Sequence, residues 1–236
     1  MQAIILAAGR GKRLGTLTDS VPKTLVKLNH LTILDRQIEI LIKNKIKEII
    51  IITGYKTQSI EKHIKKKYPK RNIKIVLNSK YLELDNLYSV WLSNNIINND
   101  FILLNGDLIF DERLISLIVN YDSCPCLIVD PNVKFDSYSV ITKDSVIKKI
   151  NFDTKKNKPN GQFIGICKFN INNLKIFQNF LKNFHRSNNL DGEYVKIFNS
   201  YLEKKISLFS LSTNNFIWFN INNKKNLTLA KEYFGY

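Results

Sequence analysis

Glycines and basic side chains are concentrated in one loop, within the string LAAGRGKRLGTLTDSVPKTL (6–25). The glycines at positions 9, 11 and 15 allow the backbone to approach a ligand closely and to adopt positive φ angles. Backbone N–H groups exposed in this way can cradle phosphate oxygens. Arg13 and Lys23 would add full positive charges against a polyphosphate. The loop is therefore predicted to wrap a nucleoside triphosphate.

The glycine spacing separates this loop from two familiar nucleotide-binding loops. A Walker loop requires Gly-Lys-Ser/Thr directly before a helix, and GRGKRLG (9–15) has no hydroxyl there. The dinucleotide fingerprint requires G-x-G-x-x-G opening a helix, and the glycines here are spaced one residue too widely. A Pro-containing stretch follows in place of a helix. The loop indicates a different type of nucleotide site.

Longer strings resemble those of a known family, the nucleotidyltransferases that activate sugar phosphates and phospho-alcohols. The main one is AIILAAGRGKRLGTLTDSVPKTLVKLN (3–29), and LLNGDLIF (103–110) is similar to the metal-binding strand end of that family. Four further strings resemble its phosphocholine cytidylyltransferase-like branch in the same order: NSKYLELDNLYSVW (78–91), GQFIGICKF (161–169), LDGEYVKIFNSYLE (190–203) and WFNINNKKNLTLA (218–230). The resemblance spans nearly the full chain.

The resemblance implies a Rossmann-like, GT-A-type α/β fold with a mainly parallel central sheet flanked by helices. It implies a single domain over 1–236, with a nucleotide-binding half (1–130) and an acceptor-binding and C-terminal half (131–236). The implied reaction joins an acceptor phosphate to the α-phosphorus of CTP and releases pyrophosphate. The implied acceptor is phosphocholine or a related phospho- or phosphono-alcohol, activated for surface polysaccharide or lipid decoration.

The resemblance also implies a role for individual residues. Arg13 and Lys23 are implied to be catalytic; Leu6, Ala7, Ala8, Gly9, Gly11, Asn78 and Asn86 to bind the nucleotide; Tyr81, Tyr88, Trp91, Gly165 and Trp218 to bind the acceptor; and Asp107 and Asn222 to bind metal. Both substrates are anionic, so catalysis must depend mostly on positioning and electrostatics. The implied ion is Mg²⁺, which bridges phosphate oxygens and keeps several waters. The alternative for Asp107 is a turn-forming residue after Gly106.

One string departs from the family pattern Trp-x-Glu-Ile-Asp-x-x-x-Asp-Leu. Its three acidic positions are occupied here by Asn220, Asn222 and Asn226. An asparagine at 222 still offers Mg²⁺ a carbonyl oxygen, but it brings no charge. Three explanations stay open: Asp107 and the triphosphate alone hold the ion, another acid such as Asp191 or Glu193 substitutes, or the chain binds nucleotide with little or no catalysis.

The acceptor-binding residues are predicted to form an aromatic wall, because aromatic faces attract quaternary ammonium groups. The candidates are Tyr81, Tyr88, Trp91 and Trp218 together with Asn86, and the acids that could add negative charge are Glu83, Asp85 and Asp136. The alternative is that the two tryptophans are packing residues. A sugar 1-phosphate acceptor, with another base on the nucleotide, is the second enzymatic interpretation.

The order of the elements supports an α/β fold. Unbroken apolar runs predict buried strands at 1–6, 48–54, 73–78, 100–107 and 126–130, and helical patterns lie between them at 33–45, 57–68 and 112–121. After about residue 130 we expect shorter strands at 137–142, 146–152, 161–170, 206–211 and 216–221, a turn at 153–161, and helices at 172–185, 192–205 and 224–234. Such alternation of strands and helices predicts a largely parallel sheet.

Composition excludes several other classes of protein. No apolar run reaches the roughly 18 residues of a membrane span, and the opening MQAIILAAG is too short for a signal peptide. Cys124, Cys126 and Cys167 lack the spacing of a zinc or redox pair, which favours a reducing cytoplasm.

The net charge of +16 has two interpretations, nucleic-acid or anionic-membrane binding and a Lys-rich background that attracts anionic small substrates. The lysines are spread along the chain and no recognition motif accompanies them, so the second is favoured. The expected partners are CTP, or another nucleoside triphosphate, and a phosphorylated small acceptor, without nucleic acid or membrane insertion. The chain is expected to be a monomer or homodimer.

Overall fold

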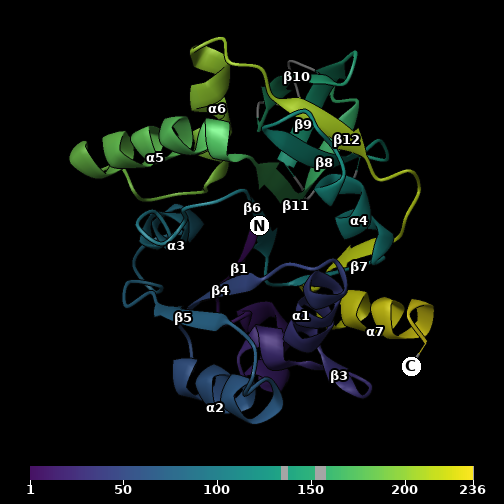
Figure 1. The fold of residues 1–236 in the computed structure, drawn as a ribbon. Coiled ribbons are helices and arrows are strands. Elements are labelled where there is room, and N and C mark those ends of the chain that lie inside the picture. The colour runs from purple at the N-terminus through teal and green to yellow at the C-terminus, as the bar shows by residue number, and fades with distance from the viewer. Residues whose placement is uncertain (134–137, 152–157, 236) are drawn as a thin grey trace.

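A computed structural model describes residues 1–133, 138–151 and 158–235. Within them, Figure 1 shows a central sheet with helices on both sides. The sheet has nine strands in the order β5-β4-β1-β6-β11-β8-β12-β10-β9. Their bounds are Gln2–Ala7 (β1), Glu48–Thr53 (β4), Ile73–Leu77 (β5), Phe101–Asn105 (β6), Cys126–Asp130 (β8), Tyr138–Lys143 (β9), Val146–Ile150 (β10), Gly161–Phe169 (β11) and Phe209–Ser212 (β12).

The first half of the sheet is parallel. Strands β5, β4, β1 and β6 are neighbours, and Ile4 of β1 is in register with Ile50 of β4 and Leu103 of β6. Parallel neighbours need crossover connections, which include the helices α1 (Ile33–Lys43), α2 (Thr57–Lys67) and α3 (Asn86–Leu92). A capping box between Thr32 and Asp35 starts α1.

The second half of the sheet is mostly antiparallel. Strand β11 runs antiparallel to both β6 and β8, and β9 and β10 form a hairpin, while β12 is parallel to β8. Only two residues separate β9 from β10, and so short a link forces antiparallel pairing. The Rossmann-like α/β class is therefore confirmed, with the parallel pairing concentrated in the first half of the sheet.

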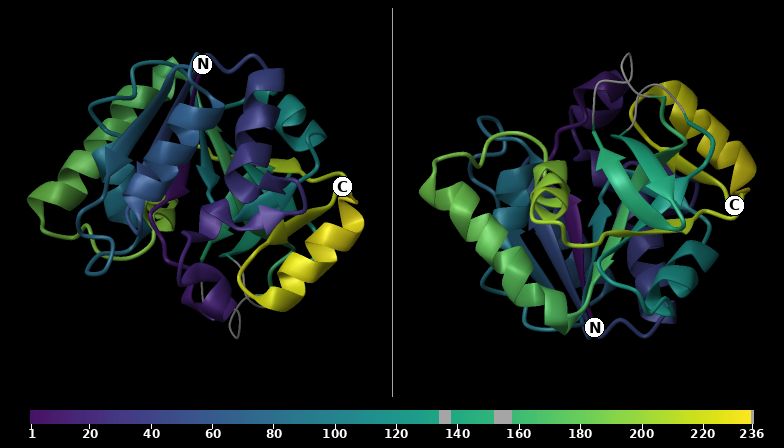
Figure 2. Two further views of the ribbon diagram at one scale, coloured as in Figure 1. Left: turned by 90° about the horizontal axis from the view of Figure 1, so that it is seen from below. Right: turned by 90° about the horizontal axis from the view of Figure 1, so that it is seen from above.

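Helices cover both faces of the sheet because successive strand residues point to opposite sides. In β1, Ile4 faces a core shared with α3, α5 (Ile171–Arg186) and α6 (Val195–Glu203). Its neighbours Ala3 and Ile5 face a second core, shared with α1, α2 and α4 (Arg113–Val119). The views in Figure 2 show the same layering from below and above. Burial on both faces explains the unbroken apolar runs of the central strands.

A smaller third core carries the C-terminal segment. There Leu14 of the glycine loop packs with Ile221 and with Leu227 of α7 (Lys224–Tyr233). Beside it β7 (Leu108–Phe110) pairs with β13 (Trp218–Asn220), and β2 (Lys27–Leu28) pairs with β3 (Leu31–Thr32). The end of the chain is thereby held against the glycine loop and the segment that follows β6.

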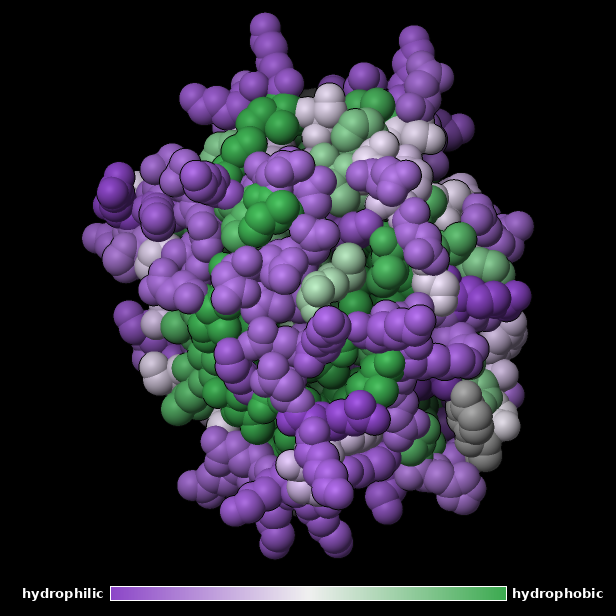
Figure 3. Space-filling view, in the orientation of Figure 1, coloured by the Kyte–Doolittle hydropathy of each residue, from purple (hydrophilic) through white to green (hydrophobic). Residues whose placement is uncertain are grey.

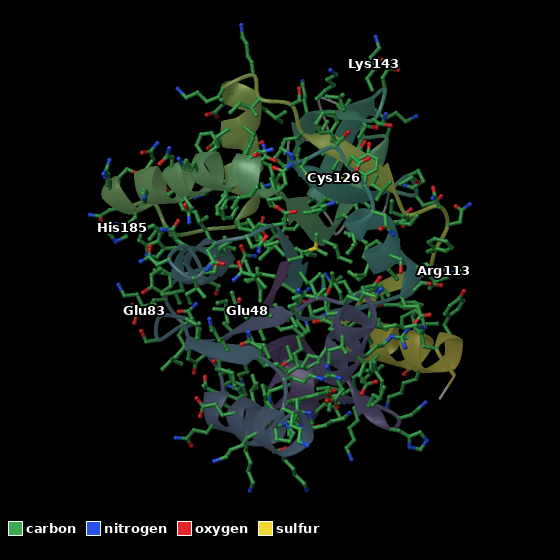
Figure 4. All side chains as sticks on the ribbon, viewed as in Figure 1. Glu48, Glu83, Arg113, Cys126, Lys143 and His185 are labelled. Carbon is green, nitrogen blue, oxygen red and sulfur yellow. The ribbon has the colours of Figure 1, made fainter. Side chains whose placement is uncertain are left out.

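Polar and charged side chains dominate the face drawn in Figure 3, with smaller apolar patches between them. The labelled side chains of Lys143 and Arg113 lie at the outside in Figure 4, whereas Cys126 lies inside, on β8. Burial raises the pKa of the Cys126 thiol, as it does for the other two cysteines, and all three are free thiols. None of the helices in the described residues combines the length and the apolar character that a bilayer crossing requires.

Candidate active site

A cleft of about 970 Å³ lies at the carboxyl ends of β1 and β6. This is where open α/β sheets bind their ligands. The predicted site residues among its lining are Leu6, Ala7, Gly9, Gly11, Arg13, Lys23, Asn86, Asp107, Trp218 and Asn222. A smaller groove, about 510 Å³, is lined by ion pairs such as Lys43–Glu112 and Arg113–Asp111, whose charges compensate one another. The larger cleft is therefore the candidate active site.

Two glycines allow the backbone to close tightly around the cleft. Gly11 has φ +75°, and a Cβ there would lie only 2.8 Å from Cβ of Lys23. A Cβ on Gly106 would lie 2.5 Å from the carbonyl oxygen of Leu6. Side chains at either position would push the loop or the end of β6 away. The glycines thus allow Lys23 to pass beside the loop and Asp107 to follow β6 directly.

Lys23 joins three parts of the chain that are far apart in sequence. Its Nζ donates to Oδ2 of Asp107 at 2.7 Å and to Oδ1 of Asn222 at 3.0 Å. The β7–β13 pairing positions Asn222, because the N–H of Ile221 donates to the carbonyl of Asp107 at 2.9 Å. Lys23 is only 9% exposed. Pro22, with φ −67°, fixes the backbone immediately before it.

The other basic residues of the loop differ in their surroundings. Lys12 and Arg13 are exposed and line the cleft. Arg10 is not part of the lining: its guanidinium pairs with Asp19 at 3.1 Å and lies over the ring of Tyr55. Lys12 and Arg13 are thus available to an anion in the cleft, while Arg10 braces the loop itself.

The oxygen donors near Lys23 fit a magnesium ion held mainly by its substrate. Asp107 supplies one carboxylate, and Asn222 supplies one amide oxygen. Oδ1 of Asn220, also in the cleft, is buried with no hydrogen-bond partner among the described residues. Mg²⁺ commonly uses one or two carboxylates, phosphate oxygens and waters. Among the described residues, no group of three or more Asp, Glu, His or Cys side chains is arranged to hold a metal ion, so other ligands would have to complete the coordination shell.

Glu193 and Asp191, the acids considered as substitutes for the missing carboxylates, differ in their surroundings. Glu193 lines the cleft, and its Oε1 accepts a hydrogen bond from the Tyr138 hydroxyl at 3.0 Å. Asp191 is exposed and is not part of the cleft lining. The side chain of Asn226 donates to the carbonyl of Asn220 at 2.8 Å, and its N–H is capped by Asn223. Asn226 therefore has a local structural role at the start of α7.

A second group of charged residues lines the cleft at α3 and α6, and it consists of acids. Asp85 caps the start of α3 through the N–H of Asn86, and Oδ1 of Asn86 accepts from the N–H of Tyr194. Burial, with a smaller contribution from the charge of Asp85, raises the pKa of Glu193 despite the bond from Tyr138. Among the described residues, neither Asp85 nor Glu193 forms a salt bridge.

The predicted aromatic wall is not assembled in this cleft. Trp91 stacks on His185, with ring centroids 4.4 Å apart, and packs against the core. Tyr88 also packs against the core, and the Lys80 ammonium lies over its ring. Tyr81 lies against Gly54, away from the cleft lining. Trp218 alone of the four lines the cleft, and its Nε1 donates to Asp130 at 2.6 Å.

Three further predicted residues, Asn78, Ala8 and Gly165, are not part of the cleft lining. Asn78 is buried and donates to the Ser89 hydroxyl at 2.9 Å. The carbonyl of Ala8 accepts from the N–H of Tyr55. Gly165, at φ +96°, packs against the side chain of Asn105, where a Cβ would meet Nδ2 at 2.5 Å. Of the acids proposed beside the aromatic wall, Glu83 is exposed outside the lining and Asp136 lies outside the described residues.

Sequence reasoning missed several residues of the lining. They are Thr24, Asn105, Tyr138, Gln162, Phe163 and Ile164. Thr24 follows Lys23 and Asn105 precedes Gly106 in the sequence. Their places beside these motif residues could have identified them as site residues. The other four residues lie on β9 and β11. Which side chains of these strands point toward the cleft depends on how the strands pair, and the sequence does not show that pairing.

Comparison with known proteins identifies the family of this chain. A sequence model of the family described as "Nucleotidyl transferase" matches residues 2–233. The choline-phosphate cytidylyltransferase of Streptococcus pneumoniae is 37% identical over 110 residues, which are 47% of this chain and 46% of that protein. The D-glycero-alpha-D-manno-heptose 1-phosphate guanylyltransferase of Campylobacter jejuni is 32% identical over 165 residues, 70% of this chain and 73% of that protein.

A solved structure of the CTP:phosphocholine cytidylyltransferase from Streptococcus pneumoniae has a similar fold. It superposes with a TM-score of 0.82 at 22% identity, over 99% of this chain and 98% of that one. The chain aligns with less than half the length of the first curated relatives it matches. The family model nevertheless covers nearly all of the described residues, including Lys23, Asp107 and Asn222. The chain therefore belongs to the nucleotidyl transferase family.

Proposed function

We propose that this protein transfers CMP from CTP to a small phosphorylated acceptor with a cationic head group, such as phosphocholine. The observation that supports this most directly is the pair of cleft carboxylates, Asp85 and Glu193, which have no cationic partner among the described residues. Glu193 is partly buried, and a carboxylate removed from water without a compensating cation is costly, so a cationic ligand beside it would stabilise its charge. The similarity to choline-phosphate cytidylyltransferase points in the same direction.

In the proposed reaction, an oxygen of the acceptor phosphate attacks the α-phosphorus of CTP. The bond between the α-phosphorus and the bridging oxygen breaks, and pyrophosphate leaves with that oxygen and its electron pair. Lys23, Arg13 and Lys12 would neutralise the phosphates, since both reactants repel each other as anions. The backbone at Gly9 and Gly11 would present N–H groups to the same phosphates.

Magnesium is proposed as the cofactor, with Asp107 and Asn222 as its protein ligands. When bound, Mg²⁺ would withdraw charge from the triphosphate oxygens. Lys23, which Asp107 holds in the free protein, would contact the triphosphate oxygens from the protein side. The base is proposed to contact the backbone of Leu6, Ala7 and Ala8, beside buried Asn78. The choice of cytosine depends on the similarity to the pneumococcal enzyme.

The acceptor head is proposed to lie against Glu193, Asp85 and Tyr138. A quaternary ammonium carries no N–H donor, so it is recognised through charge and aromatic faces rather than hydrogen bonds. Tyr138 and Phe163 supply aromatic surface in the cleft, and the two acids supply the charge. These residues replace the aromatic wall expected from Tyr81, Tyr88 and Trp91.

A sugar 1-phosphate is the second candidate acceptor. The relative from Campylobacter jejuni, named as a heptose 1-phosphate guanylyltransferase, aligns with a larger part of this chain than the pneumococcal enzyme does. Sugar hydroxyls donate hydrogen bonds to carboxylates, so Glu193 and Asp85 could also bind such an acceptor.

The test is pyrophosphate release measured with CTP, UTP, GTP and ATP against phosphocholine, phosphoethanolamine, a phosphono-alcohol and several sugar 1-phosphates. We expect release with CTP, and a much lower KM for the cationic acceptors than for the neutral ones. Release with a sugar phosphate and not with phosphocholine would overturn the proposal in favour of the second candidate. Nucleotide binding without release from any pair would identify a non-catalytic homologue.

A further inference from the structure

The ammonium group of Lys23 occupies the position between the two oxygens proposed to bind magnesium. Nζ lies 2.7 Å from Oδ2 of Asp107 and 3.0 Å from Oδ1 of Asn222. We propose that Lys23 is a resident cation that closes the metal site in the free protein, and that a divalent ion enters only when a triphosphate draws the ammonium away. This inference rests on the proposed function for the identity of the ion and of the triphosphate.

The two cations cannot share the site as it stands. Mg²⁺ binds oxygen at about 2.1 Å, so an ion on both oxygens would lie within a few ångströms of Nζ. The Lys23 side chain is 11% exposed and that of Asp107 is 25% exposed, so water screens their charges only in part. Repulsion between like charges is strong at this separation. A metal ion must therefore displace the ammonium or stay out.

Lys23 is held in this position by the backbone around it. The side chain of Lys23 passes directly over Gly11. A Cβ added to Gly11 would lie 2.8 Å from Cβ and Cδ of Lys23 and 2.9 Å from its Cγ. The short 3-10 turn over Lys23–Leu25, preceded by Pro22, fixes its Cα. An ammonium has three donors, and Asp107 and Asn222 use two of them. The third has no acceptor among the described residues and is available to a phosphate oxygen, which is the contact that would start the exchange.

The neutral side chain at position 222 fits this arrangement. One carboxylate, Asp107, balances one ammonium in the free protein. A second carboxylate would hold Lys23 more strongly in the free protein, and it would also attract the divalent ion once the ammonium has left. Asn222 still orients the ammonium and still offers an oxygen to a metal ion. The asparagine is therefore consistent with an exchange of cations.

Binding of Mn²⁺ to the intact protein, measured by electron paramagnetic resonance without any nucleotide, tests the exchange. We expect weak binding to the wild type and binding tighter by about tenfold or more to Lys23→Met, as expected for loss of a like charge a few ångströms away. Lys23→Arg retains the charge and is expected to bind Mn²⁺ as weakly as the wild type. The matched control is Lys12→Met, which removes a cleft cation that does not contact Asp107, and it should change the affinity much less.

Equal Mn²⁺ affinity in the wild type and in Lys23→Met would overturn the proposal, and so would equal gains in Lys23→Met and Lys12→Met. Circular dichroism of each variant checks the fold, and Lys23→Gln is the second neutral variant if Lys23→Met does not fold. Adding Asp107→Asn to the neutral variant should abolish the gain. Because no substrate is present, a failure here leaves the acceptor and the reaction to be decided by pyrophosphate release.

Discussion

Two charged groups line the same cleft, and they differ in whether their charges are balanced. Around Lys23, one ammonium meets one carboxylate and one amide oxygen within 3.0 Å. Around Glu193, the carboxylates of Glu193 and Asp85 line the cleft, and among the described residues they accept hydrogen bonds from the Tyr138 hydroxyl and from the N–H of Asn86. The charges of the first group are balanced before any ligand binds, whereas the second group has no cation within salt-bridge distance among the residues that the structure describes. The end of the cleft around Lys23 is therefore organised before a ligand binds, and the acidic end is the part of the cleft that we propose binds the cationic head group of the acceptor.

The largest effect is expected from removing the cation of the balanced group. Lys23→Ala should lower kcat by ~100-fold or more, the scale of losing a preorganised group that stabilises developing charge. Pyrophosphate release under saturating substrates measures this loss. The control is Lys43→Ala, which breaks an exposed ion pair with Glu112 outside the cleft and should leave kcat unchanged. A folded Lys23→Ala protein with nearly normal kcat would show that the charge of Lys23 does not contribute to catalysis.

Asp35 and its hydrogen-bond partners form a second balanced group, outside the cleft. We expect this group to affect the stability of the fold rather than catalysis. The buried carboxylate of Asp35 accepts from His63 at 2.7 Å and from the hydroxyl of Tyr68 at 3.0 Å. Burial acts to raise its pKa, but hydrogen bonds from His63 and Thr32 outweigh burial and lower the pKa to about 2. A lowered folded-state pKa means that the stabilisation is complete above the unfolded value of 3.8 and is lost as the pH falls through about 2.

Asp35→Asn is accordingly expected to lower the free energy of unfolding by about 2 kcal/mol at pH 6 and by much less near pH 2. Denaturant unfolding at both pH values measures this. Glu203→Gln, which removes an exposed carboxylate, serves as the control and should have little effect at either pH. A destabilisation of equal size at both pH values would show that the carboxylate charge of Asp35 is not what stabilises the fold.

The central sheet could be predicted because its strands are covered on both faces. The run at 126–130 matches β8 at both ends, and the runs at 48–54 and 73–78 end one residue beyond β4 and β5. The short helix α3 was missed, since it has only seven residues and its apolar face, with Leu87 and Val90, is too brief to show a period. The antiparallel second half depends on tertiary pairing, and the predicted 153–161 turn lies largely outside the described residues.

The sequence predicted the site residues that belong to a motif. It did not predict those whose positions depend on tertiary packing. The motif residues Lys23 and Asp107 lie together, and Asn222 joins them through the pairing of β13 with β7. Trp91 could not be located in this way, because its surroundings depend on how α3 meets His185 on α5. No pattern in the sequence distinguishes an aromatic residue that faces a ligand from one that faces another helix.

A smaller effect is expected from neutralising an acid of the unbalanced group. Glu193→Gln keeps an acceptor for the Tyr138 hydroxyl and removes one negative charge, so KM for phosphocholine should rise by about tenfold with little change in kcat. KM for a neutral phospho-alcohol should change much less. The matched control is again Glu203→Gln, an exposed acid at the end of α6. Equal rises in KM for charged and neutral acceptors would mean that Glu193 does not recognise charge.

The smallest effect is expected from a change at Asn222, the neutral side chain that contacts Lys23. Asn222→Asp would place a second carboxylate beside Asp107, and this charge attracts a divalent ion more strongly than it attracts the single charge of Lys23. The magnesium concentration that gives half-maximal activity should therefore fall severalfold. Titration of activity against magnesium measures it, with Asn214→Asp, an exposed loop position, as the control for net charge. A rise in the required magnesium would mean that the added carboxylate holds Lys23 more strongly than it attracts the metal ion. The lysine would then be the stronger competitor, and the asparagine would be the residue that allows the metal ion to bind at all.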